Sequence, residues 1–168
     1  PRSTPKPSSA ASDVYKRQGK VFRFGETKIR FSNPLFHGIE YSRLGWVFLT
    51  IVEYRNEKFI HSSDLNGPII EDYANLIVRE NPDYIVLDGP ATYMLGYTLN
   101  LINLRRVLDN MKKIIKCVDF KTMIWDHHLV REKRFREHTA CIWKLAKKYK
   151  KEVMTAAEFL GKKPVVEL

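Results

Sequence analysis

The sequence predicts an α/β domain over residues 20–168, and three observations lead to this prediction. Segments in which apolar and polar residues alternate come first, as in β-hairpins. From residue 68 onward, short apolar segments alternate with segments whose apolar residues recur every three to four positions, which is typical of strands packed beneath helices. The chain of 168 residues, 44% hydrophobic and 12% aromatic, is also large enough to bury one core.

The first residues differ from the rest of the chain. Residues 1–18, PRSTPKPSSAASDVYKRQ, are rich in Pro, Ser and Ala and show neither periodicity. Such a segment buries too little apolar surface to offset the chain entropy lost on folding. It also resembles a translated cloning adaptor. We therefore expect residues 1–19 to be a non-native or disordered segment and exclude them from the predicted domain.

Two hairpins open the predicted domain. Alternation over Lys20–Phe24 and Thr27–Phe31, on either side of a turn at Gly25-Glu26, predicts the first hairpin. The strongly apolar segment Gly45–Tyr54 predicts one long strand, and Lys58–His61 predicts the strand that returns beside it.

Strands and helices then alternate to the end of the chain. In the second predicted helix, for example, Leu104, Leu108 and Met111 recur at helical spacing. The three intervening strands are short and apolar, which favours burial on both faces. We expect helices over residues 68–80, 99–115 and 129–150, strands over 83–87, 122–125 and 153–155, and a last helical turn over 156–160.

The composition favours a cytoplasmic protein. The longest apolar run, Gly45–Val52, is shorter than the ~18 residues needed to span a bilayer. The first residues lack the pattern typical of a signal peptide. Two cysteines, Cys117 and Cys141, are too few for a disulfide framework or a four-cysteine zinc site. We therefore expect free thiols in a reducing compartment and no membrane partner.

The positive charge is concentrated in one stretch. The chain has a net charge of +10, and residues 105–151 alone hold 15 basic and 5 acidic side chains, a net of +10. Such a stretch can attract nucleic acid or another polyanion. It can equally be a solvated helix face, because it contains no recognition motif for nucleic acid.

Polar residues gather where the predicted strands end. In α/β folds, ligands bind at the carboxyl ends of the strands. Imidazole and carboxylate groups are good ligands for Zn, Mn or Fe, and a carboxylate that bridges two ions suits hydrolysis. The candidate metal ligands, and neighbouring carboxylates, are therefore His37, Asp64, Asp88, Asp126, His127 and His128.

The histidines are not equivalent candidates. His127 and His128 are adjacent, so on a strand they would point to opposite faces, and one of the two is expected to be a ligand. His61 is expected to be a strand-end histidine that bonds to the backbone, and His138 to be a helix surface residue. His37 lies in a loop, where functional residues concentrate.

Several segments, in order, resemble a known family. The chain looks like the later part of the metallo-β-lactamase superfamily and, more narrowly, of the largely archaeal UPF0282 family of predicted metal-dependent hydrolases. The GPATYMLGY segment resembles that family's GPPTYLLGY, with Ala91 in place of a proline, and DHHLVRE resembles its DHHLLRD. The segments that carry the resemblance are residues 37–38, 44–47, 61–68, 89–97, 126–132 and 155–161.

The resemblance implies a fold, a metal site and a reaction. The fold is a four-layered αββα sandwich, of which this chain would be the C-terminal half. Two divalent cations, Zn or alternatively Mn or Fe, would activate a hydroxide that attacks an ester or phosphodiester-like substrate. The ligands would be His37, a bridging Asp64, and His127 or His128, with His128 slightly favoured by the pattern of a histidine followed by an apolar and a basic residue. Asp126 would orient a ligand histidine from outside the coordination shell.

The resemblance also implies that a catalytic loop is missing. The superfamily holds its metals with an HxHxDH motif, which this sequence does not contain. We therefore expect a C-terminal fragment of a metal-dependent hydrolase that is itself inactive. A half-sandwich lacks the sheet that should cover it, so Val47, Leu49 and Ile51 are expected to be partly exposed and the fragment to aggregate or dimerise.

Two alternative functions fit parts of the sequence. A DHH after a strand is also the signature of DHH phosphoesterases, although Asp64-Leu65-Asn66-Gly67 fits their first motif poorly. The basic stretch at residues 105–151 could instead make the chain a nucleic-acid-binding module without enzymatic activity. Binding that falls steeply with salt and is unaffected by chelation would favour that alternative.

Overall fold

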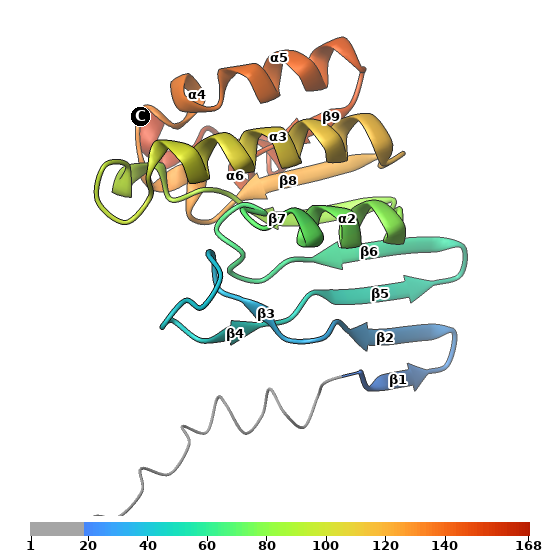
Figure 1. The fold of residues 1–168 in the computed structure, drawn as a ribbon. Helices are drawn as coiled ribbons and strands as arrows, with labels where there is room; N and C mark the ends of the chain where they lie inside the picture. Colours follow the sequence, from blue (N-terminus) through green and yellow to red (C-terminus); the bar gives the residue numbers. More distant parts are fainter. Residues whose placement is uncertain (1–18) are drawn as a thin grey trace, which may run out of the picture.

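The computed structural model describes residues 19–168, and the adaptor-like segment at residues 1–18 lies outside the described residues. The described chain forms a seven-stranded mixed sheet in the order β1-β2-β5-β6-β7-β8-β9, accompanied by five α-helices (Figure 1). The predicted α/β class is confirmed. The strands of this sheet are β1 (Val21–Phe24), β2 (Thr27–Phe31), β5 (Thr50–Tyr54), β6 (Glu57–His61), β7 (Tyr84–Asp88), β8 (Thr122–Asp126) and β9 (Glu152–Met154).

The N-terminal strands form the antiparallel part of the sheet. β1 pairs with β2, β2 with β5, and β5 with β6, which confirms both hairpins. The single strand predicted over Gly45–Tyr54 is wrong, because β4 (Trp46–Val47) pairs with β3 (Leu35–Phe36) in a separate two-stranded sheet. The chain changes sheets at Leu49, which exchanges hydrogen bonds of 3.0 Å with the amide and the hydroxyl of Ser32.

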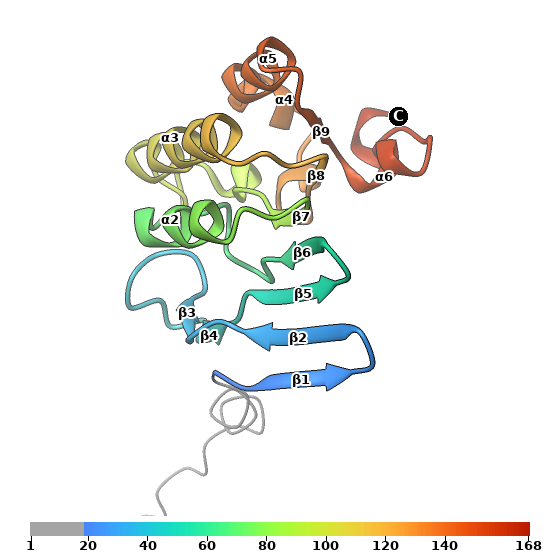
Figure 2. The same cartoon turned by 90° about the vertical axis from the view of Figure 1, so that its right-hand side faces the viewer.

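The C-terminal strands form the parallel part. β6, β7, β8 and β9 pair in parallel. Their crossover helices lie on one face of the sheet, whereas α6 lies on the other face, beside β8 (Figure 2). Because parallel strands end at the same edge, the carboxyl ends of β6, β7 and β8 meet. The helices are α2 (Glu71–Glu80), α3 (Leu101–Cys117), α4 (Phe135–His138), α5 (Ala140–Lys148) and α6 (Ala156–Phe159).

One predicted helix is broken. Residues 129–150 form a 3-10 turn, η2 (Leu129–Arg131), followed by α4 and α5, instead of one continuous helix. The break between α4 and α5 lies at Thr139, whose φ is −116°. Its hydroxyl donates to the Phe135 carbonyl at 2.6 Å and accepts the Trp143 indole N–H at 2.8 Å. A threonine that bonds locally in this way competes with the helical hydrogen-bond ladder.

The helix-covered face of the sheet is closed. Ile51, Ile60 and Leu87 lie on it and are at most 1% exposed. The prediction that Leu49 and Ile51 would be partly exposed is therefore wrong: they are 0% and 1% exposed, and only Val47 is half-buried. The reason is the register of β5, which turns Ile51 toward the helices and Val52 away from them.

The opposite face is open and apolar. Phe59, Tyr84, Val86 and Ile124 are half-buried there, and with Phe159 of α6 they line an apolar groove of about 300 Å³. We call this surface the open face. Only α6 lies over it among the described helices (Figure 2). One sheet face lacks cover, as predicted. Phe59, Tyr84, Val86 and Ile124 lie on it, whereas Leu49 and Ile51, which were expected there, are buried.

Two sequence expectations concern the chain as a whole. Cys117 and Cys141 are free, as expected, and both are exposed. Within residues 19–168, no helix combines the length and apolarity that crossing a membrane requires.

Candidate functional site

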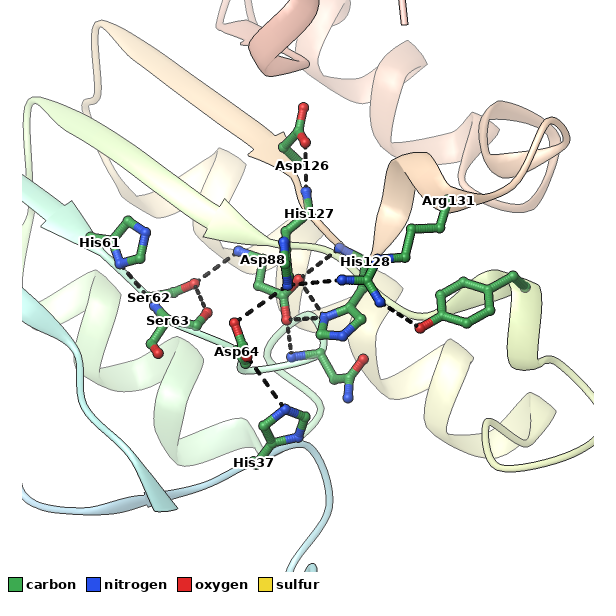
Figure 3. Close-up of polar contacts among 12 residues, drawn as sticks. His37, His61, Ser62, Ser63, Asp64, Asp88, Asp126, His127, His128 and Arg131 are labelled. Atoms are coloured by element: carbon green, nitrogen blue, oxygen red, sulfur yellow. Dashed lines mark hydrogen bonds and ion pairs between the residues drawn. The ribbon is translucent and has the colours of Figure 1, made fainter. Parts of the chain in front are cut away.

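Polar side chains from four segments meet at the carboxyl edge of the parallel strands (Figure 3). The segments are the loop after β3, the loop after β6, the end of β7 and the turn after β8. They are far apart in the sequence and adjacent in space because three of them follow neighbouring parallel strands. We call this set the strand-end site; it comprises His37, Asp64, Asp88, Asp126, His127 and His128.

A tight turn presents Asp64. Ser63 and Asn66 have φ values of 55° and 59°, and Gly67 follows with φ 66°, all in the left-handed region. The Asn66 N–H donates to Asp88 Oδ2 at 2.6 Å, which ties the turn to the end of β7. Side chains on such constrained backbone are frequently functional. The Asp64 side chain is 47% exposed and faces the other loops of the site.

His37 comes from the small two-stranded sheet. The Phe36 N–H donates to the Tyr73 hydroxyl of α2 at 2.7 Å, and the His37 N–H donates to the Gly45 carbonyl at 3.2 Å. The first bond holds this segment against α2, and the second joins the two ends of the loop between β3 and β4. The His37 Nε2 atom lies 3.7 Å from Asp64 Oδ2. Its Nδ1 atom is buried and has no hydrogen-bond partner within residues 19–168.

His127 faces Asp64 from the other side. Its φ of 56° is unusual for a residue other than glycine, and its N–H donates to Asp126 Oδ1 at 2.7 Å. This conformation turns the ring toward the loop after β6. The His127 Nε2 atom lies 3.6 Å from Asp64 Oδ1. Asp64 therefore directs one carboxylate oxygen at each of two imidazoles.

These two separations are chemically informative. Both exceed the usual length of a hydrogen bond. Two ligand atoms bound tetrahedrally to one ion at about 2.1 Å lie about 3.4 Å apart. The separations of 3.7 and 3.6 Å thus fit one cation beside each oxygen of Asp64. Each of these positions has one imidazole and one carboxylate oxygen. Among residues 19–168, no group of three or more His, Cys, Asp or Glu side chains is arranged to hold a metal ion.

Asp88 and His128 form a buried pair beneath these residues. Their side chains are 2% and 11% exposed. The His128 Nδ1 atom lies 2.9 Å from both Asp88 oxygens, and the His128 backbone N–H donates to Oδ1 at 3.1 Å. Because a carboxylate only accepts, this bond assigns the proton to Nδ1. Asp88 therefore fixes the turn after β8 as well as the turn after β6.

The structure distinguishes the two neighbouring histidines. Their ring centroids are 4.5 Å apart and their planes cross at 76°. The His127 ring faces Asp64 and the His128 ring faces Asp88. Asp126, expected to orient a ligand histidine, contacts His127 through the backbone N–H and accepts the Ala156 N–H at 2.6 Å with its other oxygen. The carboxylate that bonds to an imidazole ring at hydrogen-bonding distance is Asp88.

A pocket of about 280 Å³ borders the site. Asp64, Asp126 and His127 line it, together with His61. The His61 Nδ1 atom accepts the Ser63 N–H at 3.1 Å, which is the backbone bond expected for this residue. His138 of α4 was expected to lie on the helix surface. Its side chain is only 20% exposed, and its Nε2 atom lies 3.3 Å from Glu132 Oε1.

The basic stretch is divided between paired and unpaired side chains. Several of its cations form ion pairs, among them Arg106, Arg134 and Arg136. The lysines at the end of α5 form no ion pair within residues 19–168. Because α5 leads directly into the start of β9, these lysines lie at the edge of the sheet opposite the strand-end site. The lysines at the end of α5 are Lys147 and Lys148, with Lys150 just after it. Lys113, Lys116, Lys133 and Lys144 also form no ion pair within the described residues, whereas Lys112, Lys121 and Lys151 do.

Comparison with known proteins supports the similarity to the UPF0282 family. The chain is 38% identical over 158 residues to the UPF0282 protein of Methanocaldococcus jannaschii, and the match covers 92% of this chain and 50% of that protein. It is 37% identical over 144 residues to that of Methanopyrus kandleri (86% and 47%) and 33% identical over 151 residues to that of Korarchaeum cryptofilum (90% and 50%). The chain thus spans about half the length of the curated relatives it matches. No family model matches it.

Proposed function

We propose that this chain carries half of the metal site of a UPF0282 hydrolase of the metallo-β-lactamase type. In this proposal His37, Asp64 and His127 are metal ligands, and Asp64 bridges two cations. His127 is preferred to His128 because its Nε2 atom faces Asp64, whereas His128 bonds to the buried Asp88.

One observation carries the proposal: the two oxygens of Asp64 face two different imidazoles at 3.7 and 3.6 Å. Both separations are longer than a hydrogen bond, and one nitrogen lies beside each oxygen, as a carboxylate that bridges two cations would require. The unpartnered His37 Nδ1 atom shows that this ring is not held by hydrogen bonds at both nitrogens within the described chain.

The residues have distinct roles in the proposed site. Two divalent cations, zinc or alternatively manganese or iron, would supply a Lewis acid and lower the pKa of water toward neutrality. Asp64 holds the two positions at a fixed separation, and the two histidines present neutral nitrogens to them. Asp88 and Asp126 hold the turn after β8 so that His127 keeps its orientation.

The remaining ligands are proposed to come from the part of the longer relatives that this chain does not match. The chain covers about half of each relative, and each proposed ion has only two donors here. The open face offers that part an apolar surface on which to pack. On this proposal the intact protein hydrolyses an ester or phosphodiester-like substrate, and the chain alone is inactive.

The ligand assignment is tested by titrating the 168-residue chain with Zn²⁺ in a calorimeter. We expect binding, and we expect Asp64→Asn to weaken it by more than about tenfold because the bridging oxygen charge is lost. His61→Gln is the matched control, since it removes an imidazole from the same edge that bonds only to backbone, and it should leave the affinity unchanged. Equal affinity in wild type and Asp64→Asn would remove Asp64 from the site.

The reaction class is tested in a full-length relative, such as the protein of Methanocaldococcus jannaschii. Hydrolysis of p-nitrophenyl esters and phosphodiesters should require a divalent cation and be abolished by asparagine at the aspartate aligned with Asp64. Activity that survives both chelation and this substitution would contradict the proposed chemistry.

A further inference from the structure

We propose that Arg131 is an anion-binding residue of the strand-end site and that the substrate carries a phosphoryl group. The proposal rests on the function proposed above and deepens it by naming the substrate class. It also gives a role to one residue in each of two segments that the metal ligands do not explain: Tyr93 in Gly89–Tyr97 and Arg131 after His128.

The position of the guanidinium is the first observation. Arg131 is the last residue of the turn η2, which begins directly after His127 and His128. Its side chain points back over the site (Figure 3). Its Nη2 atom lies 3.2 Å from His127 Nε2. The other arm donates to the Tyr93 hydroxyl at 3.3 Å, and the guanidinium carbon lies 5.9 Å from the centre of the Tyr93 ring. The arginine is therefore held on two sides by partners that carry no negative charge.

The missing counter-charge is the second observation. Within residues 19–168, Arg131 forms no ion pair, although Arg134 pairs with Glu137 and Arg136 with Glu158 in the same segment. The neighbouring Glu132 contacts a histidine of α4 instead. A guanidinium that is positioned but not neutralised is ready to bind an anion, commonly a phosphate or carboxylate.

The contact with His127 strengthens the argument. If a cation takes the Nε2 lone pair of His127, Arg131 loses its acceptor and lies beside a second positive charge. An anion that contacts both cations reduces their mutual repulsion. A phosphoryl group can do this, because one oxygen can face the ion while others accept the fork of N–H groups from Arg131. The same contacts oppose the negative charge that develops during hydrolysis of a phosphate ester.

One further feature favours a bound anion. Tyr93 keeps the guanidinium plane in place through its ring and hydroxyl, so the arginine loses little freedom when an anion binds.

The test titrates the chelator-treated 168-residue chain with inorganic phosphate and follows the arginine Nε–H resonances by NMR. We expect saturable binding that Arg131→Met weakens by roughly tenfold or more, because a charge-assisted pair is lost. Arg131→Lys keeps the charge without the fork and should give an intermediate affinity. Arg134→Met, an exposed arginine three residues on, is the matched control and should bind phosphate as wild type does.

The outcomes separate this proposal from the metal site. Phosphate binding that is unchanged in Arg131→Met, or acetate binding as tight as phosphate binding, would overturn the phosphoryl assignment. A parallel titration with Zn²⁺ should not be weakened by Arg131→Met, since the arginine is not a ligand and its removal takes away a positive charge beside His127. Loss of phosphate binding in this variant from a chain that binds no Zn²⁺ would uphold the anion site and contradict the metal ligands instead.

Discussion

The Asp88 carboxylate is 2% exposed and accepts hydrogen bonds from two different loops. One bond comes from the backbone of Asn66, and two come from the backbone and ring of His128. The carboxylate thus couples the loop that presents Asp64 to the turn that presents the histidines. A buried charge with this many partners contributes to stability as well as to the geometry of the site.

We predict that Asp88→Ala lowers the free energy of unfolding by about 2–4 kcal/mol, because it leaves buried donors without an acceptor. Urea denaturation followed by circular dichroism measures this change. Asp72→Ala, which removes an exposed carboxylate from the first turn of α2, is the control and should cost less than about 1 kcal/mol. Similar losses in the two variants would show that Asp88 does not organise the edge.

At the residue scale, sequence patterns predicted which side chains meet at the site but not which histidine faces Asp64 and which faces Asp88. Polar residues after successive strands indicated that His37, Asp64 and the adjacent histidines would meet, and they do. The choice between His127 and His128 depends on the positive φ of His127 and on the pairing of His128 with Asp88, 40 residues away. Single-residue backbone conformations and distant pairs leave no periodic signal in a sequence.

Among the elements, α3 anchors the loop that carries His37. Arg106 of α3 donates to Glu71 of α2 at 2.7 Å. It also donates at 3.0 Å to Glu40, which lies three residues after His37 in the same loop. The hydrogen bond from Arg106 lowers the pKa of Glu71 to about 2, and a bond from the same guanidinium lowers the pKa of Glu40. The network therefore links two helices to the loop after β3.

This network predicts a pH dependence of stability. Because the folded pKa of Glu71 is depressed from 4.5 to about 2, its contribution is complete above pH 4.5 and is lost as the pH falls toward 2. The free energies of unfolding of wild type and Arg106→Gln should differ by less than about 1 kcal/mol at pH 7, since these carboxylates are half-exposed. The difference should shrink below pH 4.5. A difference that stays constant down to pH 2 would contradict the assignment.

Element types were more predictable than element continuity. Helical spacing and apolar runs located the helices at residues 71–80 and 101–117 and every strand of the main sheet, within three residues at most boundaries. The breaks at Leu49 and Thr139 were not predicted. At both breaks a hydroxyl bonds to backbone groups, that of Ser32 to the Leu49 N–H and that of Thr139 to the Phe135 carbonyl, and these bonds override the local periodicity.

A close approach between elements also shapes the site. A Cβ atom added at Gly89 would lie 2.4 Å from Leu129 Cβ, so the end of β7 and the turn η2 can meet only because this residue is glycine. This packing places Asp88 under the turn that carries His128. The sequence shows the glycine, but the need for it becomes evident only when the two segments are seen in contact.

For the whole molecule, the two sheet faces differ in cover. The helix-covered face is closed, whereas the groove on the open face has almost entirely apolar walls formed by Phe59, Tyr84, Val86, Ile124 and Phe159, among others. A contiguous exposed apolar surface is typical of an interface. The resemblance to half of a sandwich predicted that one face would lack cover; which residues form that face depends on strand register, since a shift of one residue exchanges the faces.

We predict that the 168-residue chain self-associates through the open face. Sedimentation velocity should show dimers or larger species at micromolar concentration, and Ile124→Lys should shift the chain toward monomer because a charge enters the groove. Ile102→Lys is the control, since Ile102 is 73% exposed on α3, on the helix-covered side. A wild-type chain that is monomeric at every concentration would contradict the prediction.

The central claim is that Asp64 bridges two cations, and anomalous diffraction from crystals of the chain soaked in Zn²⁺ tests it most directly. We predict anomalous peaks beside Asp64, one about 2.0–2.2 Å from His37 Nε2 and Asp64 Oδ2 and the other at the same distances from His127 Nε2 and Asp64 Oδ1. Zinc bound only at other histidines, such as His61 or His138, with no peak within bonding distance of Asp64, would contradict it.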